Sequence, residues 1–304
     1  MKKLLNTLFV TTQGSYLSKE GEAIAVKVEK EIKLRIPIHT LSGIVCFGNV
    51  SMSPFLMGFC AEKDVAVCFM TQYGRFLARI KGPVSGNVLV RREQYRRADK
   101  EDISSRIAAA ILSAKISNCR RVLQRFLRDH KDKTEDGRIQ KAVNHLERSM
   151  RDISGPLLTL NRIRGIEGDA AAGYFHVFDS LITAQKKEFS FTGRNRRPPR
   201  DEVNCLLSFL YTLLMHDVRS ALESAGLDPG VGFLHRDRPG RAGLALDMME
   251  EFRPLIADRL TLTLINLGQV NKNDFFKKDS TAVYMTDEGR KKVLVAYQKR
   301  KQDQ

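Results

Sequence analysis

One histidine and two carboxylates lie close together in a strongly basic part of the chain. Asp247 and Glu250 are three residues apart on a helix expected to begin near residue 242, so they share one face of that helix. His235 precedes them across a loop that contains Pro239, and this loop is long enough to return the imidazole to the same face. The spacing therefore predicts two oxygen ligands and one nitrogen ligand directed into one cleft.

A third carboxylate, Glu167, stands in a segment rich in glycine and alanine. Gly165, Gly168 and the alanines after them would allow helices to approach closely. We therefore expect Glu167 to enter a crowded interior. The candidate set is Glu167, His235 and Glu250, with Asp247 as a nearby fourth catalytic residue.

This donor set indicates a particular kind of metal chemistry. Oxygen-rich ligation with one imidazole suits Mg²⁺ or Mn²⁺ better than zinc, which prefers cysteine and histidine. On a phosphodiester, such an ion neutralises developing charge and activates a hydroxyl or water. Acidic pairs at this spacing also occur on solvated helices, and a single histidine is often a surface or core residue, so spacing alone leaves both interpretations open.

The charge of the chain favours a nucleic-acid partner. Its 304 residues include 51 Lys and Arg against 35 Asp and Glu, a formal net charge of +16, which fits a phosphate-rich or anionic-membrane partner but also simple solubility. A proline-stiffened loop before an apolar helix carries the best candidate DNA contacts, which are Arg194, Arg196, Arg197 and Arg200. The alternative for this loop is a merely solvated segment.

The pattern of apolar and polar residues changes along the chain, so the expected fold class is α+β. Residues 1–90 alternate apolar and polar side chains, which predicts a small antiparallel, β-rich domain, with Ser53 capping a helix that starts at Pro54. Residues 91–304 have helical periodicity, which predicts a larger all-α catalytic and DNA-binding domain. Its expected helices are 101–129, 135–151, 167–186, 201–225, 242–266 and 286–299.

Cysteine usage and hydropathy bear on location. The five cysteines show no Cys-x-x-Cys spacing and lie among apolar residues, as buried thiols of a reducing cytoplasm do. The longest apolar run, Val203 to Met215, contains Asn204 and is shorter than the roughly 20 residues that a membrane span needs. We expect a soluble cytoplasmic protein that does not bind a membrane.

Several motifs spread over nearly the whole chain are those of one family. They are Gly43-Ile-Val-Cys-Phe-Gly48, Gly165-Ile-Glu-Gly-Asp169, Arg196-Arg-Pro-Pro-Arg-Asp-Glu-Val-Asn204 and Leu244-Ala-Leu-Asp-Met-Met-Glu-Glu-Phe-Arg-Pro254. With them the chain resembles the integrases of CRISPR adaptation, the family of the first Cas protein. The stretch Gly232-Phe-Leu-His-Arg-Asp-Arg-Pro-Gly240 is most similar to members from type I-C systems.

The resemblance implies roles for the candidate residues and for partners. It assigns the family's metal ligands to Glu167, His235 and Glu250, and places Asp247 beside the site. It further implies a homodimer built by the β-rich domain, and two such dimers holding a dimer of the second Cas protein in a heterohexamer, across which double-stranded spacer DNA lies. The fourth Cas protein is a further possible partner at the level of the subtype.

The implied reaction is transesterification, in which a 3′-hydroxyl of the spacer attacks a phosphodiester at the border of a CRISPR repeat. Two other functions remain open at this point. A structure-selective nuclease of branched DNA would use the same metal site with water as the nucleophile. A DNA-binding scaffold with an inactive acidic site would bind DNA without metal and form no covalent product.

Overall fold

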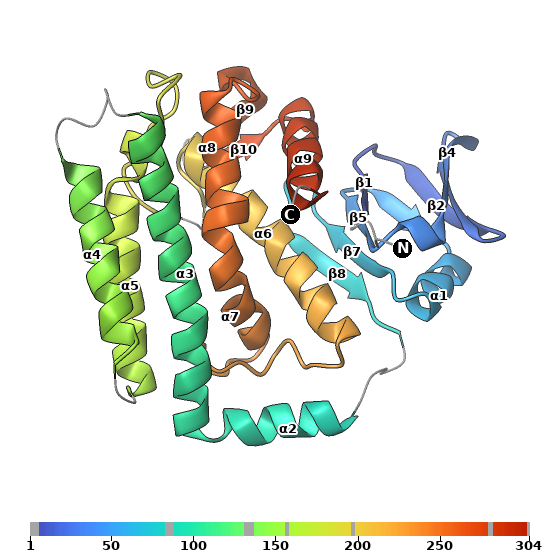
Figure 1. The fold of residues 1–304 in the computed structure, drawn as a ribbon. Coiled ribbons are helices and arrows are strands. Elements are labelled where there is room, and N and C mark those ends of the chain that lie inside the picture. Colours follow the sequence, from blue (N-terminus) through green and yellow to red (C-terminus); the bar gives the residue numbers. More distant parts are fainter. Residues whose placement is uncertain are drawn as a thin grey trace. The chain divides into compact units, whose positions relative to one another are not determined.

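The computed structural model describes residues 6–82, 88–130, 137–155, 158–195, 198–278 and 282–302. The chain divides into two compact units, one formed by Met1–Ser85 with Tyr284–Gln304 and the other by Gly86–Val283 (Figure 1). The sequence predicted a boundary after residue 90 and a helical domain that continues to residue 304. The actual division comes slightly earlier, and the C-terminal segment belongs to the first unit.

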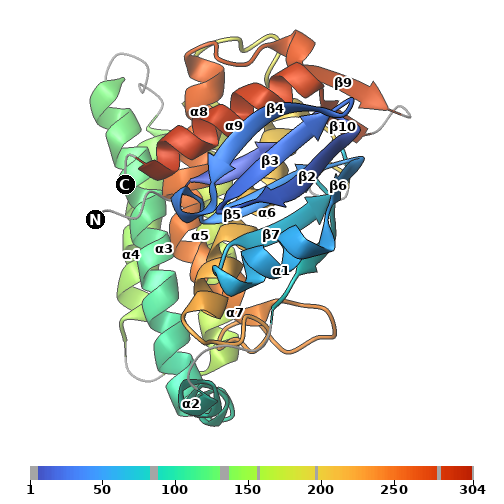
Figure 2. The same ribbon diagram turned by 90° about the vertical axis from the view of Figure 1, so that its right-hand side faces the viewer.

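Two four-stranded sheets form most of the first unit. The strands of one sheet, in spatial order, are β1 (Thr7–Val10), β5 (Gly43–Phe47), β7 (Ala66–Met70) and β8 (Phe76–Ile80). Those of the other sheet are β4 (Glu31–Pro37), β3 (Ala23–Val28), β2 (Ser15–Glu20) and β6 (Val50–Met52), and Figure 2 shows β4, β3 and β2 side by side.

The expectation of a purely antiparallel module was wrong. The pairs β1–β5, β5–β7 and β2–β6 are parallel, whereas β2–β3, β3–β4 and β7–β8 are antiparallel. Alternation of apolar and polar residues reports which face of a strand is wet and carries no information on the direction of its neighbour. All five residues of β5 are buried, as in a strand covered on both faces.

Two α-helices and a short 3-10 helix, Ile38–Thr40, complete the described part of the first unit. The helix α1 (Pro54–Glu62) begins as predicted, because the Ser53 side chain accepts a hydrogen bond of 3.2 Å from the amide of Leu56. Leu17, Ile24 and Ile44 are fully buried in the core of the first unit. The C-terminal helix α9 (Asp287–Gln302) buries Val293, Leu294 and Tyr297, so a predicted helix forms here but contributes to the β-rich unit.

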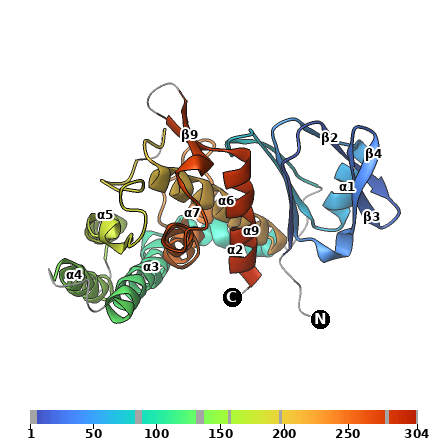
Figure 3. The ribbon, with the colours of Figure 1, turned by 90° about the horizontal axis from the view of Figure 1, so that it is seen from above.

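The second unit is built around one long helix, α3 (Glu101–Asp129), which contacts α4, α5 and α7. Figure 3 shows α3, α4 and α5 nearly end-on as a group of neighbouring helices. The other helices of this unit are α2 (Val88–Ala98), α4 (Arg138–Ile153), α5 (Leu160–His176), α6 (Glu202–Ser224), α7 (Gly243–Phe252) and α8 (Arg259–Asn266).

Most of the helices predicted for this unit form, but their bounds differ, and the helix predicted at 167–186 already ends at His176. The helix α2 was missed, and α5 begins at Leu160 instead of residue 167, because Thr159 caps it by accepting a hydrogen bond from the amide of Arg162. The strand β9 (Phe275–Lys278) pairs with β10 (Ala282–Met285), so the residues after 90 are not purely helical.

The predicted helix 242–266 forms with an irregular turn in its middle. The chain runs from α7 through a π-helical turn, Arg253–Asp258, into α8. Pro254 lacks an amide hydrogen and cannot donate to the carbonyl of Glu250, which breaks the regular α-helical ladder at this point. Such turns are frequent at functional sites, and this one begins three residues after the candidate ligand Glu250.

All five cysteines are buried free thiols, as expected. Burial raises the pKa of Cys46 and of Cys205 to about 12, so neither is a reactive thiolate at neutral pH. Among the residues that the structure describes, no helix has both the length and the apolar character needed to cross a membrane.

Candidate metal and DNA site

Three helices bring two carboxylates and an ammonium group together in the second unit. Glu167 comes from the middle of α5, Glu250 from the last turns of α7, and Lys115 from α3. The Lys115 ammonium forms an ion pair with Glu167 Oε1 and lies 2.7 Å from Glu250 Oε2. The structure thus brings together the two glutamates predicted from the sequence, with a lysine between them that the sequence interpretation missed.

Glu250 is the more enclosed of the two carboxylates, with 4% of its side chain exposed. Its Oε1 lies 2.6 Å from the Arg253 guanidinium, which sits in the π-helical turn that follows α7. Burial opposes ionisation of Glu250, but Arg253 and then Lys115 outweigh it and hold the pKa of this carboxyl below its ordinary value. Glu250 is therefore an anion at neutral pH, as a metal ligand must be.

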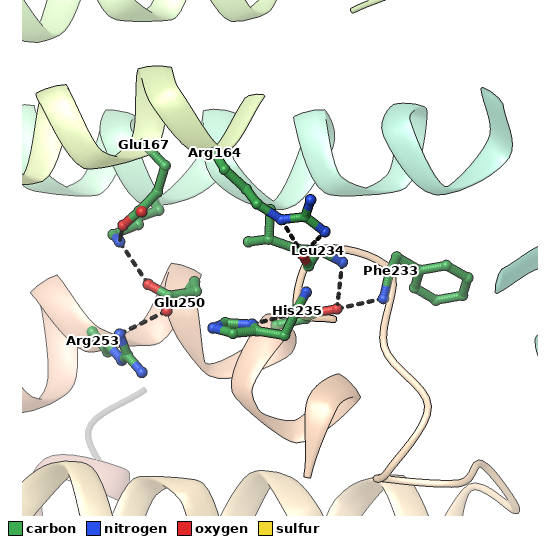
Figure 4. A network of polar contacts seen from close by, with 9 residues as sticks. Arg164, Glu167, Phe233, Leu234, His235, Glu250 and Arg253 are labelled. Carbon is green, nitrogen blue, oxygen red and sulfur yellow. Dashed lines mark hydrogen bonds and ion pairs between the residues drawn. The ribbon is translucent and has the colours of Figure 1, made fainter. Parts of the chain in front are cut away.

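His235 is held in one orientation by Asp247, which is fully buried. The Asp247 Oδ1 lies 2.6 Å from His235 Nδ1 and accepts a 3.0 Å hydrogen bond from the His235 amide. Its Oδ2 accepts hydrogen bonds from the amides of Phe233 and Leu234 (Figure 4). Both carboxylate oxygens are thus engaged, and the opposite ring nitrogen, Nε2, points away from Asp247.

These bonds define the role of Asp247 more closely than the sequence could. We predicted Asp247 as a catalytic residue near the site. In the structure it fixes the imidazole and the loop, and it is not among the residues that line the pocket. Metal-binding histidines commonly have such a carboxylate behind them, because it sets the tautomer and the ring orientation.

The loop that carries His235 is anchored from two sides. The buried Gln94 of α2 donates hydrogen bonds to the carbonyls of Asp228 and Val231, each 2.8 Å long. Arg164 of α5 donates from Nε and an Nη to the carbonyl of Leu234, at 2.8 and 2.6 Å. The path of the loop therefore depends on helices remote in sequence, which explains why the spacing of His235 from Asp247 alone could not place the ring.

Gly232 lies at the closest approach within this loop. A Cβ built on Gly232 would come within 2.6 Å of Asp247 Oδ2 and 2.7 Å of the backbone of Gly243. In contrast, a Cβ on Gly165 or Gly168 would meet no described atom within 4 Å, outside the neighbouring backbone of its own helix. The expectation that Gly165 and Gly168 allow close helix approach was wrong, and the crowding lies around Gly232 instead.

The candidate ligands open into one pocket of about 350 Å³. Its lining residues are Arg164, Glu167, Leu234, His235, Arg236, Arg238, Arg241 and Glu250. Burial and repulsion from Arg236 lower the pKa of Arg164, which shows how closely these cations are gathered. An acidic pair surrounded by arginines can bind a cation and a phosphate group side by side. The arginines between residues 236 and 241 were a visible signal in the sequence, because they follow His235 in the same loop.

The donor atoms fit a divalent metal, although no three His, Cys, Asp or Glu side chains of the described residues are arranged to hold one ion. Glu250 Oε2 is buried, and the Lys115 ammonium lies 2.7 Å from it. This oxygen and Glu167 Oε1 already face one cation, and His235, whose Nδ1 faces Asp247, lines the same pocket. Oxygen donors with one imidazole match Mg²⁺ or Mn²⁺.

Of the four arginines predicted to bind DNA, the structure describes Arg194 and Arg200, which differ in exposure. Arg194 turns toward α6, where it donates to Asn204 Oδ1 at 2.6 Å, and its guanidinium lies 5.1 Å from the ring centre of Tyr211. Arg194 is therefore half-buried and packs within the unit, and a role for it in DNA contact stays a prediction. Arg200 is exposed, and Arg196 and Arg197 lie outside the described residues.

Fold and pocket together define a two-part α+β protein with an acidic pair and an oriented imidazole in a basic pocket. The family model described as CRISPR associated protein Cas1 matches residues 8–299. The chain belongs to the Cas1 family.

Curated relatives extend over the whole chain. It is 56% identical to a CRISPR-associated endonuclease Cas1 of Chlorobaculum tepidum and 48% identical to one of Rhodospirillum rubrum, in each case over 100% of this chain and 88% of the relative. It is also 34% identical to a CRISPR-associated exonuclease Cas4/endonuclease Cas1 fusion of Geobacter sulfurreducens, over 96% of this chain and 52% of the fusion.

Solved structures share the fold. The CAS1 protein of Thermotoga maritima superimposes with a TM-score of 0.84 at 25% identity, over 97% of this chain and 90% of that chain. A Cas6-RT-Cas1–Cas2 complex gives a TM-score of 0.81 at 24% identity over 98% of this chain and 32% of that one. A casposase bound to its integration product gives 0.80 at 23% identity, over 97% and 82%.

Proposed function

We propose that this protein is the integrase of CRISPR adaptation, a DNA endonuclease and transesterase that inserts the 3′-ends of spacer DNA into the CRISPR repeat. The observation that carries this proposal is the pocket in which Glu167 and Glu250 share a cation beside His235, enclosed by arginines. Family membership and relatives named as endonucleases support it.

The residues of the pocket divide the work of the reaction. A bound Mg²⁺ or Mn²⁺, held by Glu167, His235 and Glu250, supplies Lewis-acid stabilisation of phosphate charge and makes a hydroxyl more acidic. Asp247 keeps the imidazole in position through its bond to Nδ1. Arg253 fixes Glu250 through Oε1, so Oε2, which faces Lys115, is the oxygen that would bind the ion.

The arginines around the pocket bind and orient the target phosphate. Arg236, Arg238 and Arg241 line the opening, where guanidinium groups pair with phosphate oxygens and hold the scissile bond. The spacer 3′-hydroxyl loses its proton and forms the new P–O bond, while the bond to the displaced 3′-oxygen breaks and that oxygen takes up a proton. With water as the attacking group, the same pocket cleaves DNA.

The partners follow from the relatives as proposals for this chain. The similar Cas6-RT-Cas1–Cas2 complex includes Cas2, which supports Cas2 as a partner of this chain. The Geobacter sulfurreducens relative is a Cas4/Cas1 fusion, which supports Cas4 as a possible partner. We further propose a homodimer formed by the β-rich unit, two of which hold a Cas2 dimer and the double-stranded spacer. Assignment to a type I-C system rests on the Gly232 to Gly240 stretch.

A joining assay separates this function from its two rivals. Purified protein, with the Cas2 partner, is incubated with a labelled short duplex and a supercoiled repeat plasmid, in Mn²⁺ or in chelator. We expect label to join the plasmid covalently in Mn²⁺ alone. Metal-dependent cutting without joining would favour a nuclease of branched DNA, and retention without either product would favour a binding scaffold.

A further inference from the structure

Lys115 occupies an unusual position for a lysine. It lies in the buried stripe of α3, one helical turn from Ile111 and from Cys119, and 11% of its side chain is exposed. A lysine in such a position is rarely tolerated unless its charge is paired. Here it is paired twice, with Glu167 on α5 and with Glu250 on α7.

The two oxygens of Glu250 have different cation neighbours. Arg253 lies at Oε1 and Lys115 at Oε2, and only Lys115 also reaches Glu167. Two carboxylates that face one another in an enclosed site repel, and the ammonium between them removes that repulsion. The atoms that Lys115 holds are therefore the same oxygens that a divalent ion would require.

We infer that the Lys115 ammonium is an internal counterion that holds the metal site closed when no divalent ion is bound, and that it must leave at least one of the two glutamates for metal to bind. Lys115 thus sets the affinity of the site for metal. This inference rests on the proposed function, because it takes Glu167 and Glu250 to be the ligands.

The energetic consequence has a definite sign. Since the ammonium is tethered to α3, it competes for the carboxylates at a fixed local concentration, whatever the protein concentration. Metal binds only the fraction of molecules in which the oxygens are free, so the apparent Kd exceeds the intrinsic Kd by the inverse of that fraction. Removal of the ammonium must tighten metal binding and weaken the metal-free fold.

The test measures Mn²⁺ binding to the metal-free full-length protein by electron paramagnetic resonance of free Mn²⁺, without DNA. For Lys115→Met, which keeps the length of the side chain and removes its charge, we expect a Kd at least about tenfold below that of the wild type. Its thermal midpoint without metal should fall, and Mn²⁺ should raise that midpoint more than it does in the wild type.

Two variants serve as controls, and a third can replace the test variant. Lys272→Met removes another lysine that pairs with a buried glutamate, Glu202, outside the pocket, and should leave the Kd for Mn²⁺ unchanged. Lys115→Arg keeps the charge and should bind Mn²⁺ no more tightly than the wild type. If Lys115→Met does not fold, Lys115→Gln replaces it, because its amide can donate hydrogen bonds to the glutamates without a charge.

Two failures are distinguishable. If the wild type and Glu250→Gln bind Mn²⁺ equally well, the proposed metal site is wrong and this inference is overturned with it. If Glu250→Gln loses Mn²⁺ while a folded Lys115→Met or Lys115→Gln binds it no more tightly than the wild type, the metal site stands and the role of Lys115 alone is refuted.

Discussion

The interiors of the two units differ in kind. In the first unit the core is apolar, with Leu17, Ile24 and Ile44 fully buried, and among its described residues Arg290 is the one charged residue that is buried. The second unit buries Lys115, Asp247, Glu250 and Asp258 within its helices. The first interior thus encloses mainly apolar side chains, whereas the second encloses a group of charged ones.

The two units differ in the interactions that stabilise their folded interiors. Burial of apolar surface contributes about 25 cal/mol per Å² to folding, so the apolar side chains of the first core stabilise that unit directly. Desolvation of ion pairs can cost more than their attraction returns, so apolar residues would serve stability as well or better around Glu250. The buried charges of Glu250, which lines the pocket, and of Lys115, which pairs with it, are therefore best explained by the chemistry of that pocket.

The largest expected effect is that of Glu250→Gln, which should break function and stability together. It leaves Lys115 and Arg253 without their shared anion, and loss of one partner of a buried ion pair costs about 3 to 5 kcal/mol. We expect no detectable strand joining and a correspondingly lower free energy of unfolding, measured in urea. A stable and active variant would mean that the charges of this interior are incidental.

In the apolar core, Leu17→Ala should affect stability alone. A cavity at a fully buried leucine costs about 2 to 5 kcal/mol, while the pocket residues keep their contacts. At a temperature where the variant is folded, we expect joining per folded molecule to equal that of the wild type. Loss of joining in folded Leu17→Ala protein would show that the two interiors are not separable in function.

A pH effect of intermediate size should arise from Asp258, whose pKa burial raises to about 6, above its ordinary value of 3.8. The folded protein then holds this proton to higher pH than the unfolded chain does, so its contribution to stability falls as pH rises from about 4 to 6. The loss is up to about 3 kcal/mol.

Asp258→Asn should remove that pH dependence. We expect the free energy of unfolding of the variant, relative to the wild type, to increase between pH 4 and pH 6, as measured by urea titration at each pH. Tyr211, whose hydroxyl donates to Asp258 Oδ1 at 2.6 Å, can still donate to the asparagine oxygen. If the difference in free energy of unfolding stays constant with pH, the pKa of Asp258 is not raised in the folded protein.

Asp247→Asn should lower metal affinity and joining by roughly 10- to 100-fold, as for other residues that orient a metal-binding histidine. Asparagine retains one acceptor oxygen, whereas Asp247 accepts hydrogen bonds from three backbone amides through two oxygens. The Kd for Mn²⁺ and the joining rate report this change. Unaltered values for both would exclude a positioning role.

The smallest effect should come from a single arginine at the opening of the pocket. Arg241→Ala is expected to weaken DNA binding severalfold and to reduce the slope of log K against log salt by about 1. Fluorescence anisotropy with a labelled duplex at several salt concentrations measures that slope. An unchanged slope would place the bound phosphate away from Arg241.

Much of this organisation could be predicted from the sequence. The periodicity of 101–129 gave α3 with the observed ends, and Ser53 gave the start of α1. Residue types and spacing, and then the family resemblance, indicated Glu167, His235 and Glu250, which the structure brings to one pocket. Local patterns and motifs of this kind remain informative because they depend on near neighbours in the chain.

The remainder depends on contacts between distant segments. Lys115 stands at a core position of the α3 pattern, which was a visible signal, but its partners on α5 and α7 were not. The anchoring of the histidine loop by Gln94 joins residues on separate elements in the same way. Parallel pairing of β1, β5 and β7 likewise leaves no mark in the alternation of side chains.

Anomalous diffraction from crystals of the wild-type protein grown with Mn²⁺ tests the central claim most directly. We predict one strong peak in the pocket, within about 2.0 to 2.3 Å of a Glu167 oxygen, a Glu250 oxygen and Nε2 of His235. A fully ordered pocket with no peak at saturating Mn²⁺, or a peak bound by other residues alone, would contradict the account.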